Sequence, residues 1–124
     1  MEYLRSEDGP APIGPYSQAV RAGNEIFCSG MIALDPQTAE LTGADAPAQA
    51  EQALRNLAAV LSAGNATLAH VVKTTVYLID MADFPAVNEV YARHFEESKP
   101  ARSTVAVRAL PKGALVEIDA IARV

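Results

Sequence analysis

The chain has 124 residues, 50% of them hydrophobic, which is enough apolar material for the core of one compact domain spanning residues 1–124. Its formal net charge is −5 and its Lys and Arg residues form no cluster, which counts against nucleic-acid binding. No apolar run approaches the roughly 20 residues of a membrane-spanning helix, and the charged stretch 1–8 is not expected to be a signal or transit peptide. Cys28 is the only cysteine, so no intrachain disulfide can form, and we expect a cytoplasmic protein.

The first half of the chain predicts a hairpin followed by a helix. Glycines and prolines at positions 9–15 indicate an extended, turn-rich segment. Residues 16–21 and 25–30 then predict two short strands around a turn at 22–24. A helix is expected over 47–63, capped by Asp45 and ended by Gly64. Its buried stripe follows the three- and four-residue spacing of a helical face and comprises Ala50, Leu54, Leu57 and Leu61.

The second half predicts a strand, a helix and two final strands. Residues 71–79 alternate as a strand would, with Val72, Thr74, Val76 and Leu78 on one face. Asp83 is expected to cap the second helix, whose buried side would comprise Val87, Val90, Tyr91 and Phe95. The last two strands contain Arg102 and Glu117, and residues 110–113 are expected to form the turn between them.

These elements give the order β-β-α-β-α-β-β and predict an α+β fold. Right-handed crossovers would place both helices on one face of a mixed sheet. On the last strand, Val116, Ile118, Ala120 and Ala122 would then lie under the helices. The opposite face would carry Leu115, Glu117, Asp119 and Ile121, which is too apolar to be left bare and too charged for a core. An oligomer built on this face would resolve the conflict.

Two opposite charges on neighbouring strands, Arg102 and Glu117, are the strongest candidates for a functional site. A charge on a strand is costly unless it is paired, solvated or used, so the two residues form either an internal ion pair or a pocket for a charged small molecule. The planar guanidinium of Arg102 can bind a carboxylate through two parallel hydrogen bonds. Glu117 could hold a water molecule or move a proton, unless it forms a salt bridge to Arg102 or Lys73.

Other reactive side chains do not form recognisable sites. His70 and His94 have no Cys, Asp or Glu partner at the spacing of metal ligands, so structural roles and no metal are expected. Cys28 lies in an apolar strand and is expected to be a small core residue. The sequence contains neither a glycine-rich phosphate loop nor a Gly-x-Ser-x-Gly nucleophile motif.

Several motifs in order along the chain resemble the Rid family of reactive intermediate (enamine/imine) deaminases, also named L-PSP endoribonucleases or translation inhibitors. The motifs are Gly14-Pro15-Tyr16-Ser17-Gln18-Ala19-Val20, Ser29-Gly30, Val72-Lys73-Thr74-Thr75-Val76, Val87-Asn88-Glu89-Val90-Tyr91, Pro100-Ala101-Arg102-Ser103 and Leu110-Pro111-Lys112-Gly113-Ala114-Leu115-Val116-Glu117-Ile118. The resemblance covers nearly the whole chain. It implies a chorismate-mutase-like subunit that assembles as a homotrimer with clefts between subunits.

The resemblance also implies an activity and a set of site residues. Members of the deaminase branch hydrolyse 2-imino acids, such as 2-iminopropanoate and 2-iminobutanoate, to 2-oxo acids and ammonia without a cofactor or metal. Arg102 matches the arginine that binds the substrate carboxylate, and Glu117 matches the position linked to the attacking water. Matching cleft positions are Tyr16, Ser29, Gly30 and Asn88, and backbone donors near Gly30 and Thr104 would steady the substrate.

Four positions depart from common family patterns and bear on substrate preference. Met31 and Ala33 stand where many members have Gln and Pro, Lys99 replaces a frequent aromatic residue, and Thr104 occupies a position where some deaminases have Cys.

Two alternatives to a deaminase remain open at the level of sequence. One is a non-catalytic protein that binds 2-oxo acids through Arg102. The other is a ribonuclease, which would need a cationic surface beside an acid–base pair.

Overall fold

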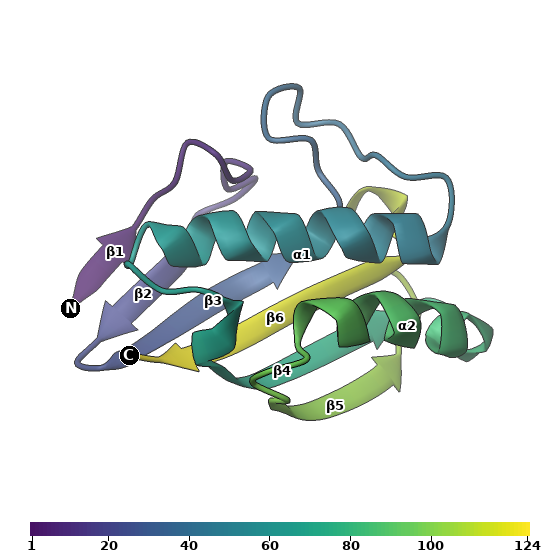
Figure 1. Cartoon of the computed structure of the whole chain (residues 1–124). Coiled ribbons are helices and arrows are strands. Elements are labelled where there is room, and N and C mark those ends of the chain that lie inside the picture. The colour runs from purple at the N-terminus through teal and green to yellow at the C-terminus, as the bar shows by residue number, and fades with distance from the viewer.

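The computed structural model describes residues 1–124 as six strands and two α-helices (Figure 1). The strands are β1 (Glu2–Leu4), β2 (Ala19–Ala22), β3 (Glu25–Met31), β4 (Val71–Leu78), β5 (Ala101–Ala106) and β6 (Val116–Arg123). The helices are α1 (Ala46–Ser62) and α2 (Phe84–His94), and short 3-10 turns lie at Leu68–His70, Met81–Asp83 and Pro111–Gly113.

All six strands form one mixed sheet in the order β1-β2-β3-β6-β4-β5, in which only β4 and β5 are parallel. Both helices cover the same face of this sheet, and β1 and β5 form its two edges (Figure 1). The predicted α+β fold is therefore confirmed. Strand β1 was missed by the sequence analysis, because three residues beside a charged stretch carry no periodic signal of their own and become a strand only by pairing with β2.

The predicted pairing of the last two strands is wrong. Strand β4 lies between β5 and β6, and the intervening 110–113 segment is a 3-10 turn at the end of a longer connection. The predicted inward face of β4 is also wrong at one position, because the β4–β6 register shifts between Val71 and Lys73. As a result, Val71 is buried and Val72 is 48% exposed.

Helix α1 forms where the sequence predicts it. The Asp45 side chain accepts a hydrogen bond from the Ala48 N–H at 3.0 Å, which caps the first turn. The predicted stripe (Ala50, Leu54, Leu57 and Leu61) is fully buried against the sheet, and each leucine contributes about 1.5–3 kcal/mol of hydrophobic stabilisation. Asp83 stands at the N-cap of α2 but makes no capping hydrogen bond, so its predicted capping role is wrong. Asp80 caps the preceding 3-10 turn.

The two faces of strand β6 differ in burial and polarity. Val116, Ile118, Ala120 and Ala122 are buried beneath the helices, as predicted. The opposite face, called the open face below, carries Glu117, Asp119 and Ile121 on β6 and the exposed side chains of Phe27 on β3 and Val105 on β5. No helix of the chain covers the open face (Figure 1).

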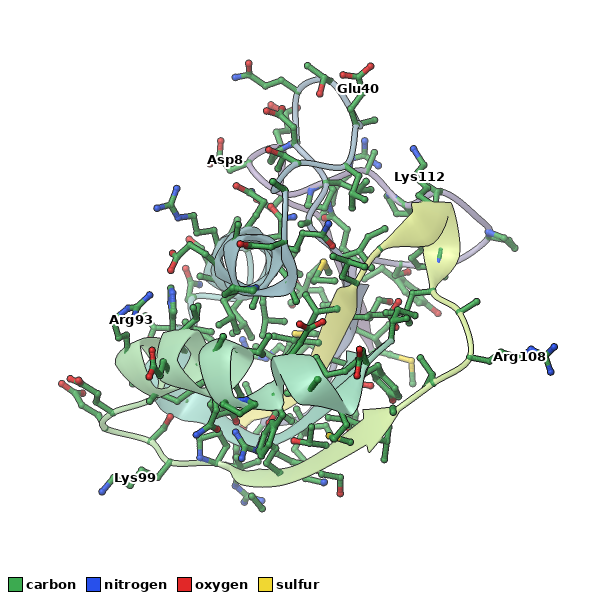
Figure 2. The ribbon with its side chains drawn as sticks, turned by 90° about the vertical axis from the view of Figure 1, so that its right-hand side faces the viewer. Asp8, Glu40, Arg93, Lys99, Arg108 and Lys112 are labelled. Atoms are coloured by element: carbon green, nitrogen blue, oxygen red, sulfur yellow. The ribbon has the colours of Figure 1, made fainter.

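Charged side chains are spread around the molecule. Figure 2 shows Arg93, Lys99, Arg108 and Lys112 projecting from different segments without gathering into one patch. This distribution agrees with the acidic net charge in offering no cationic stripe for a nucleic-acid backbone. Neither helix has the length and apolar character that crossing a membrane requires.

Candidate functional site

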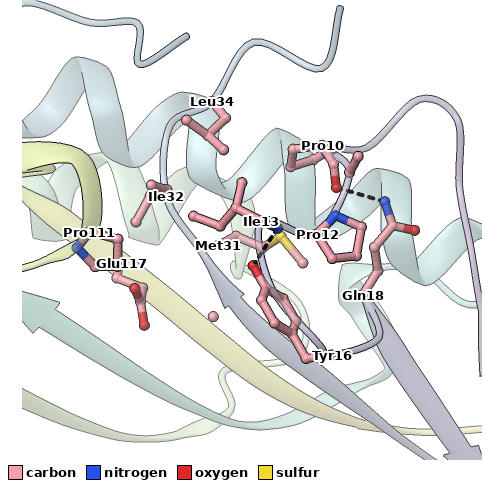
Figure 3. A pocket seen from close by; sticks show the side chains of 12 residues that line it. Pro10, Pro12, Ile13, Tyr16, Gln18, Met31, Ile32, Leu34, Pro111 and Glu117 are labelled. Carbon is pink, nitrogen blue, oxygen red and sulfur yellow. Dashed lines mark hydrogen bonds between the residues drawn. The ribbon is translucent and has the colours of Figure 1, made fainter. Parts of the chain in front are cut away.

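Glu117 faces a small pocket on the open-face side of the sheet, called the Glu117 pocket below (Figure 3). The cavity has a volume of about 50 Å³ and brings together three of the predicted site residues: Tyr16, Gly30 and Glu117. Its apolar walls are formed by Pro12, Ile13, Met31, Ile32, Leu34 and Pro111. A half-buried carboxylate in a small apolar pocket can interact with only one or two atoms of a ligand or water.

The absence of a side chain at Gly30 makes room for the Glu117 carboxylate. A Cβ atom at this position would lie 2.8 Å from Glu117 Cδ, which is too close for a real contact. The chain's ion pairs join Glu51 to Arg55 and to His94, so Glu117 has no cationic partner. Burial, and secondarily the nearby Asp119 carboxylate, raises the pKa of Glu117 above the ordinary glutamate value. A carboxylate with a raised pKa is a better proton acceptor near neutral pH.

Gly30→Ala should therefore impair the site without unfolding the protein. We expect the added methyl group to displace the Glu117 carboxylate and slow any reaction that depends on it by about ten- to a hundredfold, in the range of a lost acid–base group. Steady-state kinetics of the single and double variants check this. In a Glu117→Gln background, Gly30→Ala should cause little further loss, and a full additional loss would show that Gly30 acts by another route.

Tyr16 presents a hydroxyl group to the same pocket. Its oxygen accepts a hydrogen bond from the Ile13 N–H at 3.2 Å, and the residue remains 48% exposed. A phenol that accepts from the backbone still has its own O–H to donate. Tyr16 can therefore offer one hydrogen bond to a ligand beside Glu117.

Arg102 lies in a separate open groove between α2 and β5, called the Arg102 groove below. Its Nη1 atom donates a hydrogen bond to Asn88 Oδ1 at 2.7 Å. The guanidinium carbon lies 5.3 Å from the centre of the Phe84 ring and 4.7 Å from that of Tyr91. The hydroxyl groups of Tyr91 and Thr74 are 2.6 Å apart, so the ring under the arginine is itself held in place. Arg102 forms no ion pair in the chain and can bind an external carboxylate.

The structure does not bring Arg102 and Glu117 together within one chain. Arg102 pairs in register with the buried Thr74 and contacts α2, so it lies on the helix side of the sheet. Glu117 pairs in register with Tyr77 and lies on the open face. The predicted alternative of an ion pair between Arg102 and Glu117 is therefore wrong for the single chain, as is one between Lys73 and Glu117.

Two other predicted residues line neither cavity. The Ser29 hydroxyl donates to the Ser17 carbonyl at 2.6 Å, so it is used to hold the chain before β2. Thr104 lies two residues after Arg102 on β5, and its Oγ1 atom is buried without a hydrogen-bond partner. Sequence analysis did not assign Phe84 or Tyr91 to the site. The i, i+4 and i+7 spacing of Phe84, Asn88 and Tyr91 on α2 is the signal that could have linked them to Asn88.

The remaining reactive groups have structural surroundings. Burial raises the pKa of the Cys28 thiol to about 12, which keeps it protonated and confirms it as a core residue. His70 Nδ1 accepts from the Thr67 N–H at 3.0 Å, and His94 Nε2 lies 3.0 Å from Glu51 Oε1, so both histidines have the expected structural roles. No group of three or more His, Cys, Asp or Glu side chains is arranged to hold a metal ion.

Comparison with known proteins places this geometry in a family. The family model described as Endoribonuclease L-PSP matches residues 6–124. A RutC family protein of Pyrococcus horikoshii is 52% identical over 121 residues, covering 98% of this chain and 96% of the relative. The 2-iminobutanoate/2-iminopropanoate deaminase of Mus musculus is 50% identical over 119 residues, covering 96% and 88%. The crystal structure of E. coli TdcF with bound serine has a TM-score of 0.94 at 38% identity, covering 100% and 99%.

Proposed function

We propose that this chain, which belongs to the Rid family matched by the Endoribonuclease L-PSP model, hydrolyses reactive 2-imino acids to 2-oxo acids and ammonia. The observation that carries this proposal is the unpaired guanidinium of Arg102, held by Asn88 over the Tyr91 ring. Such a group is suited to the carboxylate that every 2-imino acid carries. The name of the mouse relative and the serine bound to E. coli TdcF agree with a small ligand bearing a carboxylate and a nitrogen atom.

The complete site would be formed by two copies of the chain. Arg102 and Glu117 lie on opposite sides of one sheet, so a ligand only a few atoms long cannot touch both in the same chain. If the open face of one copy packs beside the Arg102 groove of another, the two residues can face one ligand. A homotrimer with three such clefts satisfies this requirement and also covers Phe27 and Val105.

The chemistry requires only positioning and proton transfer. Arg102 would bind the substrate carboxylate and fix the adjacent C=N carbon. Glu117 would accept a proton from water while the water oxygen forms a bond to that carbon. The same proton would then pass to the imine nitrogen, which gives a carbinolamine. Transfer of the remaining hydroxyl proton to that nitrogen, again through Glu117, would break the C–N bond, so that ammonia leaves as the C=O bond of the 2-oxo acid forms. Tyr16 could donate a hydrogen bond to the substrate or the intermediate.

One observation counts against the ribonuclease alternative, and one measurement would separate the binding alternative. The family model's description names an endoribonuclease, but the chain is acidic and the four Lys and Arg side chains labelled in Figure 2 lie apart from one another. A non-catalytic binder of 2-oxo acids would use Arg102 equally well, and only turnover separates it from an enzyme.

The decisive assay generates imines in place with an amino-acid oxidase acting on alanine or 2-aminobutyrate. Semicarbazide traps the free imine, so an active deaminase should lower the rate of semicarbazone formation and raise the yield of 2-oxo acid. Bovine serum albumin at the same concentration serves as the control. If the wild-type protein leaves trapping unchanged but binds 2-oxobutanoate in calorimetry, the binding alternative is correct.

A further inference from the structure

We propose that Gln18 is a positioning residue that sets the place of Tyr16 in the Glu117 pocket, a proposal that rests on the proposed function. Gln18 lies one residue before β2 and is 3% exposed. It ends the loop between β1 and β2, called the N-terminal loop below and comprising residues 5–18. This loop supplies Pro10, Pro12, Ile13 and Tyr16 to the pocket.

The Gln18 carboxamide forms hydrogen bonds to two places in this loop. Its Oε1 atom accepts from the Ser6 N–H at 2.7 Å, while Nε2 donates to the Ser6 carbonyl at 3.1 Å and to the Pro10 carbonyl at 2.8 Å (Figure 3 shows the bond to Pro10). Both N–H groups and the oxygen of the amide are therefore used. One buried side chain fixes the start and the middle of the loop relative to β2.

The N-terminal loop has few other polar contacts to define its shape. Among residues 6–16, the only backbone–backbone hydrogen bond joins the Tyr16 N–H to the Gly14 carbonyl. The loop also contains three prolines, which have no N–H to donate. Gly9 packs closely against α1, since a Cβ atom there would lie 3.0 Å from Val60 Cγ2. The Gln18 side chain thus supplies the main polar contacts that join residues 6–16 to the base of β2.

Loss of these hydrogen bonds would act on the pocket through the loop. Removing the carboxamide leaves the buried Pro10 carbonyl and the Ser6 amide without partners, which favours a loop that opens toward water. Because the Tyr16 hydroxyl accepts its hydrogen bond from Ile13 within the same loop, Tyr16 would move with the loop. The residue opposite Glu117 would then be misplaced although neither site residue had changed.

The test compares Gln18→Met with Ile26→Val in the imine assay and in amide hydrogen exchange. Gln18→Met keeps a long side chain but removes the hydrogen bonds, and we expect at least a tenfold loss of kcat/KM and faster exchange in residues 10–17. Ile26→Val removes a buried methylene group where β3 meets the end of α1, away from the pocket, and should change neither. If Gln18→Met does not fold, Gln18→Glu replaces it, because an ionised carboxylate cannot donate to the two carbonyls.

A double-mutant cycle with Tyr16→Ala separates positioning from a general structural role. If Gln18 acts through Tyr16, the two losses of kcat/KM should be less than additive. Additive losses, or a Gln18→Met variant as active as the wild type, would overturn the proposal. If the wild-type protein hydrolyses no imine, the proposed function fails by itself. Amide exchange then decides about Gln18, and unchanged exchange in residues 10–17 would refute its role.

Discussion

Arg102→Ala should abolish imine hydrolysis while leaving the fold and the assembly intact. Lys99 also lines the Arg102 groove, but only the guanidinium offers a planar fork, and both the charge-assisted bonds to the substrate carboxylate and the alignment of the C=N carbon depend on it. We expect kcat/KM to fall by about a thousandfold or more, since charge-assisted bonds and orientation are lost together. The fold should tolerate the change, because Arg102 is exposed and donates only to Asn88. The imine assay and light scattering on the same preparation check both parts.

Two further substitutions make this prediction specific. Arg102→Lys should also fail badly, because a lysine cannot reproduce the planar fork that stacks over Tyr91 and reaches Asn88. Arg93→Ala removes another exposed arginine, from the last turn of α2, and should leave turnover unchanged. If Arg102→Ala retained near wild-type turnover, the Arg102 groove would not be part of the site.

Glu117→Gln should separate ligand binding from chemistry. The amide keeps the size of the carboxylate but cannot accept a proton at neutral pH, so we expect turnover to fall by about 10²–10⁴-fold, the usual range for an acid–base group. Calorimetry with 2-oxobutanoate should show nearly unchanged binding, because Arg102 is intact. A variant with wild-type turnover would remove Glu117 from the mechanism.

The same variant should not lose stability at neutral pH. The folded chain raises the pKa of Glu117 by burying it, so the protonated form is favoured by folding. Protonated Glu117 therefore contributes its full stabilisation below the pKa that it has in the unfolded chain. This contribution is lost as the pH rises through the pKa that Glu117 has in the folded chain. As the pH rises from the unfolded-state pKa of Glu117 to its folded-state pKa, the wild type should become less stable relative to the Glu117→Gln variant. Unfolding curves from pH 4 to about pH 8 measure the difference, and a variant that melted lower at neutral pH would indicate a hidden ion pair for Glu117.

Local features of the fold could be predicted from the sequence, whereas the contacts between distant strands could not. The buried stripe of α1 and the alternation of β6 follow from helical and strand periodicity, and Asp45 is a recognisable cap. The insertion of β4 between β5 and β6 is a non-local pairing that no turn signal encodes. The insertion separates Arg102 from Glu117 by a strand, and the registers of the two pairings put them on opposite sides of the sheet, so their apparent proximity in the sequence analysis was misleading.

For the site residues too, the sequence predicted some features and missed those that depend on contacts between distant segments. Motif resemblance identified Tyr16, Gly30, Asn88, Arg102 and Glu117, all of which line one of the two cavities. It could not show that Ser29 bonds to Ser17, because a hydroxyl group has no directional signature in a sequence. Nor could it show why position 30 is a glycine, since this depends on the approach of a carboxylate from a strand far along the chain.

Complementation between two inactive variants tests the central claim that each site is built from two copies of the chain. Arg102→Ala and Glu117→Gln chains are mixed in equal amounts, unfolded and refolded together, or co-expressed with different tags. If Arg102 and Glu117 of neighbouring copies share a site, about a quarter of the sites receive both intact residues, and about a quarter of wild-type turnover should return. If both residues served one ligand within the same chain, every site would carry one lesion, and the mixture would stay as inactive as its parents.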